Sequence, residues 1–547
     1  MKASCGPSLG GGFSRGIATA IAFSILGATG CAPAPPPTVT ASLASPESQG
    51  RNIILVLSDT HRLDHVSGFS PKTDDPTPHV ASLIRSGAVF PGAITPVPIS
   101  APAYATLMTG RLPTEHGLLN NQQQLSPAHP LLQEKLRNAG YRTAAVVSNP
   151  YCSSGHGFAR GFDHFWDQVE GRGKEGEIVT SEAIEWLESI ADGEAFFLFL
   201  AYMDAHTPYI SDTLPPSLRM DVNGVRVRDA QPENAHIEQR YPVSLHPGRN
   251  VIALSFLDMD GPASPTDAPS PLHVKGLRLA SGRALERTTG VEEVEGTGFE
   301  RLANRSELVI TNPESEAVDD ELVFRCFRKY RHERIPAFYE AGVRSFDRSF
   351  GRLTGYLEQR GLFEDAIIIF LSDHGEMLGE HDSWGHVGHL WDETLRIPLV
   401  IKAPGLPGGV RDPARIGLRD IHDLILSMAL GPDDERDGVM QARRHEPFVA
   451  ATYPPEAPSL QVAVIHEGYK IVVEADGSER AFDLRSDPSE GTQLIMNRRD
   501  EPELAALLTI ARTELATAAA TESLDLDALS QEERDRLRAL GYLDGDE

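Results

Sequence analysis

Two short apolar segments, far apart in the sequence, constrain the fold most. Ile53–Leu57 (IILVL) is too short for a buried helix and rich in β-branched residues, and Ala366–Leu371 (AIIIFL) repeats the pattern. Continuous apolar runs of this length are typical of parallel strands that helices cover on both faces. The sequence therefore predicts an α/β fold with a mixed, mostly parallel sheet flanked by helices.

Metal-binding side chains follow both predicted strands. Asp59 stands just beyond the first strand, and Asp373 and His374 follow the second. Ligands of open α/β sheets bind at the carboxyl ends of the strands, so we expect these three side chains to hold one divalent cation. Their oxygens favour Ca²⁺, Mg²⁺ or Mn²⁺, with Ca²⁺ our first expectation, and the imidazole allows Mn²⁺ or Zn²⁺. In the alternative, each Asp only caps the helix that follows it.

Length and charge narrow the class of protein. A chain of 547 residues holds two to four domains, and 40% hydrophobic residues are enough for large cores. The net charge of −28 argues against nucleic-acid binding and suits an exported protein. Cys152 and Cys326 can form a disulfide in an oxidising compartment or remain free thiols.

The N-terminus has the pattern of a targeting segment. Lys2 and Arg15 precede the apolar stretch Gly16–Gly30, and the sequence then reaches Cys31 as Ala-Thr-Gly-Cys, similar to a bacterial lipobox. We predict a signal peptide over 1–30, lipidation of Cys31 and a Pro/Ala/Ser tether over 31–50. The protein would then be a membrane-anchored lipoprotein, periplasmic or on the cell surface. Ordinary secretion with cleavage nearby is the alternative.

A proline-rich loop leads to a serine in a chemically favourable place. Regular structure is hindered up to Ser100 by nearby prolines, whereas Ala103–Thr109 has a helical composition. Ser100 is thus expected at a helix N-terminus, where free N–H groups favour an anion. It is either a simple N-cap or a nucleophile aimed at a phosphate- or sulfate-like centre.

This loop carries a family resemblance. It reads Ser100-Ala-Pro-Ala-Tyr104 and then ends in Thr109-Gly110-Arg111. This resembles the signature of the sulfatases of the alkaline phosphatase superfamily, which runs Cys-or-Ser, any, Pro, Ser, Arg and then a helix into Thr-Gly-Arg. The resemblance implies that Ser100 is the nucleophile, contacts the metal and is oxidised to formylglycine. It places Arg111 in substrate binding or in support of the loop. Tyr104 departs from the family's Arg.

Two further stretches are similar to the same family. Met203–Tyr209 follows the apolar run Phe196–Ala201 and matches the Asp-any-His-any-Pro-Tyr loop, which implies that His206 contacts the substrate anion or the leaving-group oxygen. In the loop after Asp373, the resemblance implies that His386 serves the leaving group, with His389 as a second, substrate-binding candidate.

The resemblance also divides the chain. We predict an alkaline-phosphatase-like sulfatase core in two parts, 51–210 and 329–460, followed by a C-terminal subdomain with a small antiparallel sheet and tail helices over 461–547. Residues 211–328 interrupt the core with short β-like runs and the hairpin signal Asn223-Gly224, which predict an inserted β-sandwich-like module. That module either binds a glycan or a partner, or acts as a structural lid.

Together these features predict a metal-dependent sulfate-ester hydrolase. Its substrate would be a sulfated, or alternatively phosphorylated, small molecule or glycan. Tyr104, and Thr60 in place of a second metal Asp, favour a phosphoester hydrolase or phosphotransferase with unmodified Ser100. A third hypothesis is a non-catalytic surface lipoprotein that binds a glycan or a partner through residues 211–328.

Overall fold

The computed structural model describes residues 50–69, 76–167, 176–207, 209, 218–230, 239–256, 272–294, 299–328, 335–455, 457–494 and 501–521. The predicted signal peptide, the tether with Cys31 and the tail beyond residue 521 lie outside these residues. Within them, no helix is both long and apolar enough to cross a membrane.

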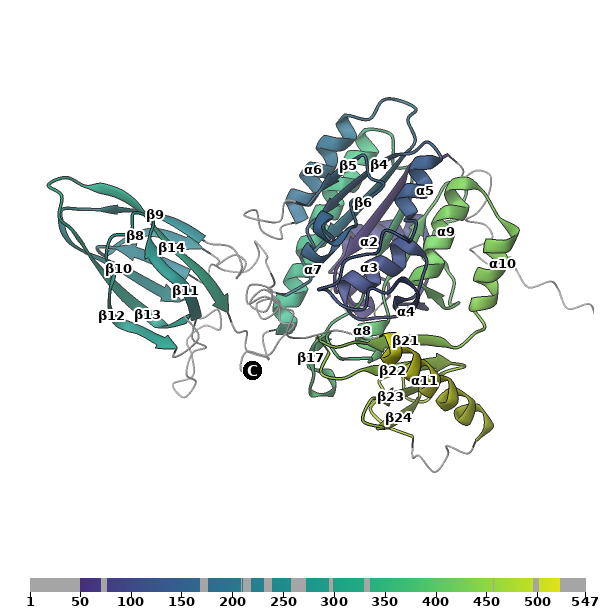
Figure 1. Cartoon of the computed structure of the whole chain (residues 1–547). Coiled ribbons are helices and arrows are strands. Elements are labelled where there is room, and N and C mark those ends of the chain that lie inside the picture. The colour runs from purple at the N-terminus through teal and green to yellow at the C-terminus, as the bar shows by residue number, and fades with distance from the viewer. Residues whose placement is uncertain are drawn as a thin grey trace, which may run out of the picture. The chain divides into compact units, whose positions relative to one another are not determined.

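A central eight-stranded sheet organises the chain (Figure 1). Strand β1 (Ile53–Ser58) lies inside it, parallel to β15 (Ile367–Leu371) on one side and to β6 (Phe196–Tyr202) on the other. The sheet order is β19-β2-β18-β15-β1-β6-β4-β5, and β18 and β2 each pair antiparallel with a neighbour. The remaining strands are β2 (Ala88–Val89), β4 (Arg142–Val147), β5 (His164–Trp166), β18 (Leu399–Lys402) and β19 (Val410–Arg411).

Alternate residues of these strands fill two separate hydrophobic layers. Leu55 and Ile369 point into the layer that includes α3, α5 and α9, whereas Val56 and Phe370 point into the layer that includes α2, α6 and α7. Every residue of β1 and β15 is buried because helices cover both faces of the sheet. The predicted mixed, mostly parallel α/β core is thus confirmed.

The helices and short turns connect these strands. They are listed here with their bounds: η2 (Leu63–His65), α2 (Pro78–Ser86), α3 (Ser100–Thr109), α4 (Pro113–His116), α5 (Leu132–Asn138), η3 (Pro150–Cys152), η4 (Ser154–His156), α6 (Gly176–Glu188), α7 (Ile335–Gln359), η6 (Glu380–Asp382), α8 (Asp392–Leu395), α9 (Leu418–Leu430), α10 (Asp434–Arg443) and α11 (Pro502–Thr521). Two small pairings, β3 (Ala93–Ile94) with β20 (Ile416–Gly417) and β16 (Met377–Leu378) with β17 (Trp384–Gly385), complete the core.

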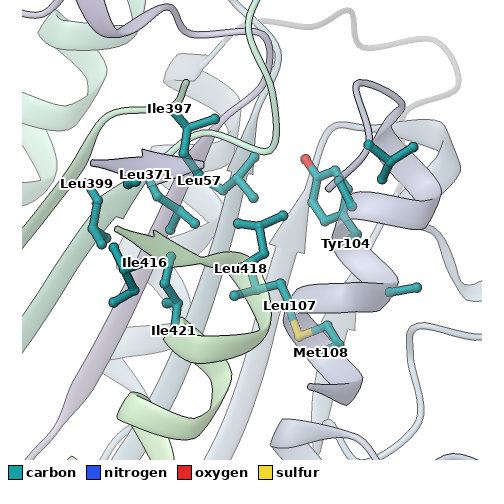
Figure 2. Packing of buried hydrophobic residues seen from close by; sticks show 14 of the residues in the cluster. Leu57, Tyr104, Leu107, Met108, Leu371, Ile397, Leu399, Ile416, Leu418 and Ile421 are labelled. Carbon is teal, nitrogen blue, oxygen red and sulfur yellow. The ribbon is translucent and has the colours of Figure 1, made fainter. Parts of the chain in front are cut away.

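The helix that begins at Ser100 is anchored in one of these layers. Figure 2 shows Leu107 and Met108 of α3 in the same cluster as Leu418 and Ile421 of α9, beside Leu57 and Leu371 from the ends of β1 and β15. Every residue of α3 is buried, so the helix has no solvent-facing side. This packing fixes the position of Ser100 relative to the strand ends.

The described strands between residues 218 and 328 form a sheet of their own. Hydrogen bonds join eight strands into one antiparallel sheet in the order β8-β7-β10-β13-β11-β14-β9, with β12 paired to β13, where the sequence predicted a sandwich. Its apolar side chains make a separate cluster that includes Leu254 and Phe324. The strands are β7 (Leu218–Val222), β8 (Val225–Ala230), β9 (Gln239–Leu245), β10 (Gly248–Phe256), β11 (Leu272–Leu279), β12 (Glu286–Val294), β13 (Phe299–Asn312) and β14 (Val318–Arg328).

A four-stranded antiparallel sheet closes the C-terminal region. It contains β21 (Phe448–Thr452), β22 (Gln461–His466), β23 (Tyr469–Glu474) and β24 (Glu479–Asp483). Because β21 pairs with β22, this sheet begins at Phe448, ahead of the boundary at 461 that the sequence suggested. Helix α11 packs against β22 and β23.

Candidate active site

Three side chains that could hold a metal ion meet where two neighbouring parallel strands end. Asp59 follows β1, and Asp373 and His374 follow β15. One ligand atom from each lies within 4.8 Å of the others, and all three residues are buried. The juxtaposition arises because β1 and β15 pair in parallel register, so their carboxyl ends reach the same edge of the sheet.

The donor atoms of this cluster suit a divalent cation. The Nδ1 of His374 lies 3.0 Å from the carbonyl oxygen of Gly375, which can only accept a hydrogen bond, so Nδ1 carries the proton and Nε2 keeps its lone pair. Neither this Nε2 nor the Oδ2 of Asp373 has a hydrogen-bond partner among the described residues, and both are buried. Buried polar atoms normally have partners, so this pair fits a bound ion.

Burial also shifts the protonation of these groups. Loss of solvent raises the pKa of Asp373 to about 7 and lowers the pKa of His374 to about 4. The imidazole is therefore neutral at physiological pH, the form in which it binds metals. A cation beside Asp373 would favour its ionised form and oppose the effect of burial.

The metal loop is held by a close backbone approach. The N–H of Gly375 donates to the carbonyl oxygen of Thr394 in α8, 2.9 Å away. A Cβ on Gly375 would lie 1.9 Å from the carbonyl oxygen of Glu393, so no larger residue fits. The glycine after His374 thus allows α8 to support the loop directly.

Ser100 lies beside the cluster as the first residue of α3. Its hydroxyl is 3.5 Å from the Oδ2 of Asp59. The next N–H, that of Ala101, donates to the side-chain oxygen of Asn121 at 2.9 Å. The ten-residue helix directs its partial positive charge toward the same place. The arrangement brings together a hydroxyl group, a helix end that favours anions and the two carboxylates and imidazole of the cluster.

Two residues with a polar contact to Asp59 were not identified as site residues from the sequence. Asn149, just beyond β4, donates from its side-chain nitrogen to the Oδ2 of Asp59 at 2.5 Å. The hydroxyl of Tyr104 lies 3.5 Å from the same oxygen, and its ring packs edge-on against Phe158 and Phe199. The place of Asn149 after a strand end was a usable signal. Tyr104 stands at the motif position of the family's Arg, which was also a signal, although an aromatic ring at this position is equally compatible with a place in the core.

Two predicted histidines lie near His374. The rings of His206 and His386 are 5.3 Å apart, and His386 is 4.4 Å from the ring of His374. The Nδ1 of His386 is 3.2 Å from the carboxylate of Glu376, and both side chains are buried. The Nδ1 of His206 pairs with the carbonyl oxygen of Thr207. Both rings are therefore held in place through Nδ1.

An arginine next to Asp59 supports the hairpin that carries Glu376. Arg62 donates to the carbonyl oxygen of Glu376 at 3.1 Å and pairs with the carboxylate of Glu380 at 2.8 Å. Its main-chain N–H donates to the hydroxyl of Tyr339 in α7, which in turn donates to the carbonyl oxygen of Thr60. The loop after β1 and the hairpin are therefore tied together.

The two remaining predicted site residues, Arg111 and His389, form no hydrogen bond with the side chains of the metal cluster among the described residues. Arg111 is exposed beyond the C-terminus of α3, about 15 Å along the helix from Ser100 at the usual rise per residue. His389 is partly buried, and burial lowers its pKa. Both stay predictions for substrate binding. Cys152 is buried with a free thiol, and burial raises its pKa.

The chain is similar to known proteins over much of its length. The family model described as Sulfatase matches residues 51–431. An N-acetylglucosamine-6-O-sulfatase of Bacteroides thetaiotaomicron is 24% identical over 405 residues, which are 66% of this chain and 65% of that protein. The chain thus spans just under two thirds of the length of this relative.

Solved structures share the fold. A structure in complex with D-glucosamine-2-N,6-O-disulfate aligns with a TM-score of 0.56 and 16% identity, covering 86% of this chain and 98% of that one. The phosphonate monoester hydrolase of Agrobacterium radiobacter aligns with a TM-score of 0.54 and 17% identity, covering 88% and 98%. The family match over most of the core, together with this fold, shows that the chain belongs to the sulfatase family.

Proposed function

We propose that this member of the sulfatase family hydrolyses sulfate esters of a sugar or another small organic alcohol, with Ser100 supplying the nucleophile. The observation that carries the proposal is the position of the Ser100 hydroxyl beside Asp59 in the buried cluster with Asp373 and His374. The relative that acts on an N-acetylglucosamine sulfate and the neighbour that binds a glucosamine disulfate support a sulfated sugar.

The residues of the chain supply orientation and proton transfer. Asp59, Asp373 and His374 would hold one divalent cation, which would stabilise negative charge on the ester oxygens when bound. The N-terminus of α3 adds a fixed positive potential for the sulfate group. Glu376 and the Thr207 carbonyl hold His386 and His206 by Nδ1, so each ring presents Nε2 to the departing oxygen.

The proposed maturation of Ser100 to formylglycine is testable by mass. Oxidation of the serine removes two hydrogens and lowers the mass of its peptide by about 2 Da. We expect the full chain, expressed in its own host, to show this shift and to hydrolyse an aryl sulfate and glucosamine 6-sulfate. The Ser100→Ala variant should lose at least about 100-fold in kcat/KM because the nucleophile is gone.

A matched control and a clear counter-result accompany this experiment. Ser86→Ala removes a hydroxyl at the C-terminus of α2 and should retain wild-type turnover. Equal turnover of sulfate esters by wild type and Ser100→Ala would contradict the proposal.

A second function has a specific observation in its favour. Tyr104 places a neutral hydroxyl near Asp59. One of the solved structures with a similar fold is a phosphonate monoester hydrolase. A neutral hydroxyl at this position suits a monoanionic substrate, a phosphodiester or a phosphonate monoester, which unmodified Ser100 would attack. An unshifted peptide mass together with faster turnover of an aryl phosphodiester than of the aryl sulfate would establish this alternative. A non-catalytic binding lipoprotein would turn over neither ester.

The exported, lipid-anchored location remains part of the proposal. It is supported by the apolar stretch Gly16–Gly30 followed by Cys31. Incorporation of labelled fatty acid in the native host, lost in Cys31→Ala, tests it directly.

A further inference from the structure

The hydrogen bonds around the metal cluster limit how many oxygens it can offer. The Oδ1 of Asp373 accepts from two backbone N–H groups, that of Thr60 at 3.2 Å and that of His374 at 2.9 Å. The hydroxyl of Ser372 lies 3.4 Å from the same oxygen, but its closer acceptor is the carbonyl oxygen of His374 at 2.6 Å. Only Oδ2 of this carboxylate is without a hydrogen-bond partner among the described residues. Asp373 is therefore arranged as a monodentate ligand.

Asp59 is engaged in a similar way. Its Oδ2 faces the side-chain nitrogen of Asn149 and the hydroxyls of Ser100 and Tyr104. An oxygen that already accepts such bonds is poorly placed to share an ion with the other oxygen of the same carboxylate. Neither carboxylate is thus prepared for the bidentate binding that Ca²⁺ often uses.

The third ligand contributes nitrogen instead of oxygen. The Nδ1–H of His374 is fixed on the Gly375 carbonyl, and its Nε2 lies 3.4 Å from the Oδ2 of Asp373. A buried imidazole nitrogen suits Mn²⁺ and Zn²⁺, whereas Ca²⁺ and Mg²⁺ prefer oxygen ligands throughout.

The residue after Asp59 adds no carboxylate. The hydroxyl of Thr60 lies 2.8 Å from the carbonyl oxygen of Asp59 and 2.9 Å from that of Ala205, and its single proton is shared between these two acceptors. Its backbone is left-handed, with a φ of 54°, and its carbonyl oxygen accepts from Tyr339. A β-branched residue rarely adopts this conformation. Thr60 thus ties strand-end loops together with its polar atoms.

From these contacts we propose that the site selects a first-row transition-metal ion, Mn²⁺ or Zn²⁺, over Ca²⁺. Two monodentate carboxylates and one imidazole, completed by Ser100 or substrate, match the few ligands that Zn²⁺ needs and the mixed donors that Mn²⁺ accepts. They fall short of the six to eight oxygens typical for Ca²⁺. The inference rests on the proposed metal site and differs from our sequence-based preference for Ca²⁺.

Metal affinity and spectroscopy test the proposal without an activity assay. The full chain, stripped with a chelator, is titrated by calorimetry with Mn²⁺, Zn²⁺, Ca²⁺ and Mg²⁺. We expect Mn²⁺ or Zn²⁺ to bind at least about tenfold more tightly than Ca²⁺ or Mg²⁺. Pulsed electron paramagnetic resonance of the Mn²⁺-loaded protein should show ¹⁴N coupling from an imidazole ligand.

Two substitutions at adjacent imidazoles sharpen the test. His374→Asp replaces the nitrogen by oxygen, so the ¹⁴N coupling should disappear and the ratio of Mn²⁺ to Ca²⁺ affinity should fall. His386→Asn alters the ring that lies 4.4 Å from His374 but is outside the ligand cluster, so both readouts should stay as in wild type.

Tighter binding of Ca²⁺ or Mg²⁺ by the wild-type chain, or Mn²⁺ without ¹⁴N coupling, would overturn the proposal. If His374→Asp does not fold, the wild-type spectrum still decides. A chain that binds Mn²⁺ or Zn²⁺ through nitrogen yet hydrolyses no sulfate ester would refute the proposed function alone.

Discussion

At the scale of the single residue, Asp204 links the core to the loop of His206. It lies after β6, is fully buried and accepts a hydrogen bond from the N–H of Gly176 at the start of α6. Burial raises the pKa of Asp204 from its ordinary value of 3.8 to about 7. A buried carboxylate with this pKa makes stability depend on pH.

The sign of this dependence follows from the raised pKa. The folded protein holds the proton more tightly than the unfolded chain, so the stabilisation is complete below pH 3.8 and is lost as the pH rises through 7. Asp204→Asn removes the ionisation. We expect the variant to match wild type near pH 4 and to exceed its free energy of unfolding at pH 8 by up to about 4 kcal/mol. Urea unfolding at both pH values measures this.

A surface carboxylate provides the comparison for Asp204. Asp192→Asn, at an exposed position, should follow the wild-type stability at both pH values. A pH profile of Asp204→Asn parallel to wild type would show that Asp204 does not carry the effect.

At the scale of the elements, a buried ion triad fastens α8 to the C-terminal sheet. The ammonium of Lys470 in β23 lies 3.1 Å from a carboxylate oxygen of Asp392 and 2.8 Å from one of Glu490. Glu490 also accepts from the N–H of Asp392. Because α8 supports Gly375 through Thr394, this contact reaches the loop of His374.

Removal of the cation from this triad should be costly. Lys470→Met leaves two acidic groups without their buried partner, so we expect a loss of about 3–5 kcal/mol in the free energy of unfolding. The double variant Lys470→Met, Glu490→Gln removes one of the stranded charges and should be more stable than the single variant. Urea denaturation of the wild type, the single variant and the double variant measures both differences in the free energy of unfolding. A loss under about 1 kcal/mol in Lys470→Met would show that the ion triad contributes little to stability.

At the scale of the whole molecule, the inserted sheet has a hydrophobic core separate from those of the main sheet. Leu254 lies in the cluster of β7–β14, whereas the layers around β1 contain no residue of that module among the described residues. Separate cores commonly unfold as separate cooperative units.

This separation predicts two unfolding transitions. Leu254→Ala creates a cavity in the inserted module and should cost that unit about 2–5 kcal/mol, while the transition of the main core and its metal affinity stay unchanged. Differential scanning calorimetry with metal titration measures both. Val225→Ala, at an exposed site in β8, is the matched control. A joint shift of both transitions would mean that the two cores fold as one unit.

The sequence alone determined the α/β core, the family and the places of Asp59, Asp373, His374 and Ser100. A buried strand can be recognised from a short continuous run of apolar residues in the sequence. Residues at the carboxyl ends of neighbouring parallel strands then lie close together, because these ends meet at one edge of the sheet. Tertiary structure alone decided the rest. Tyr104 and Glu376 enter the site only through packing and side-chain hydrogen bonds between distant segments. The number of carboxylate oxygens left for a cation depends on the same long-range contacts, and no local pattern encodes it.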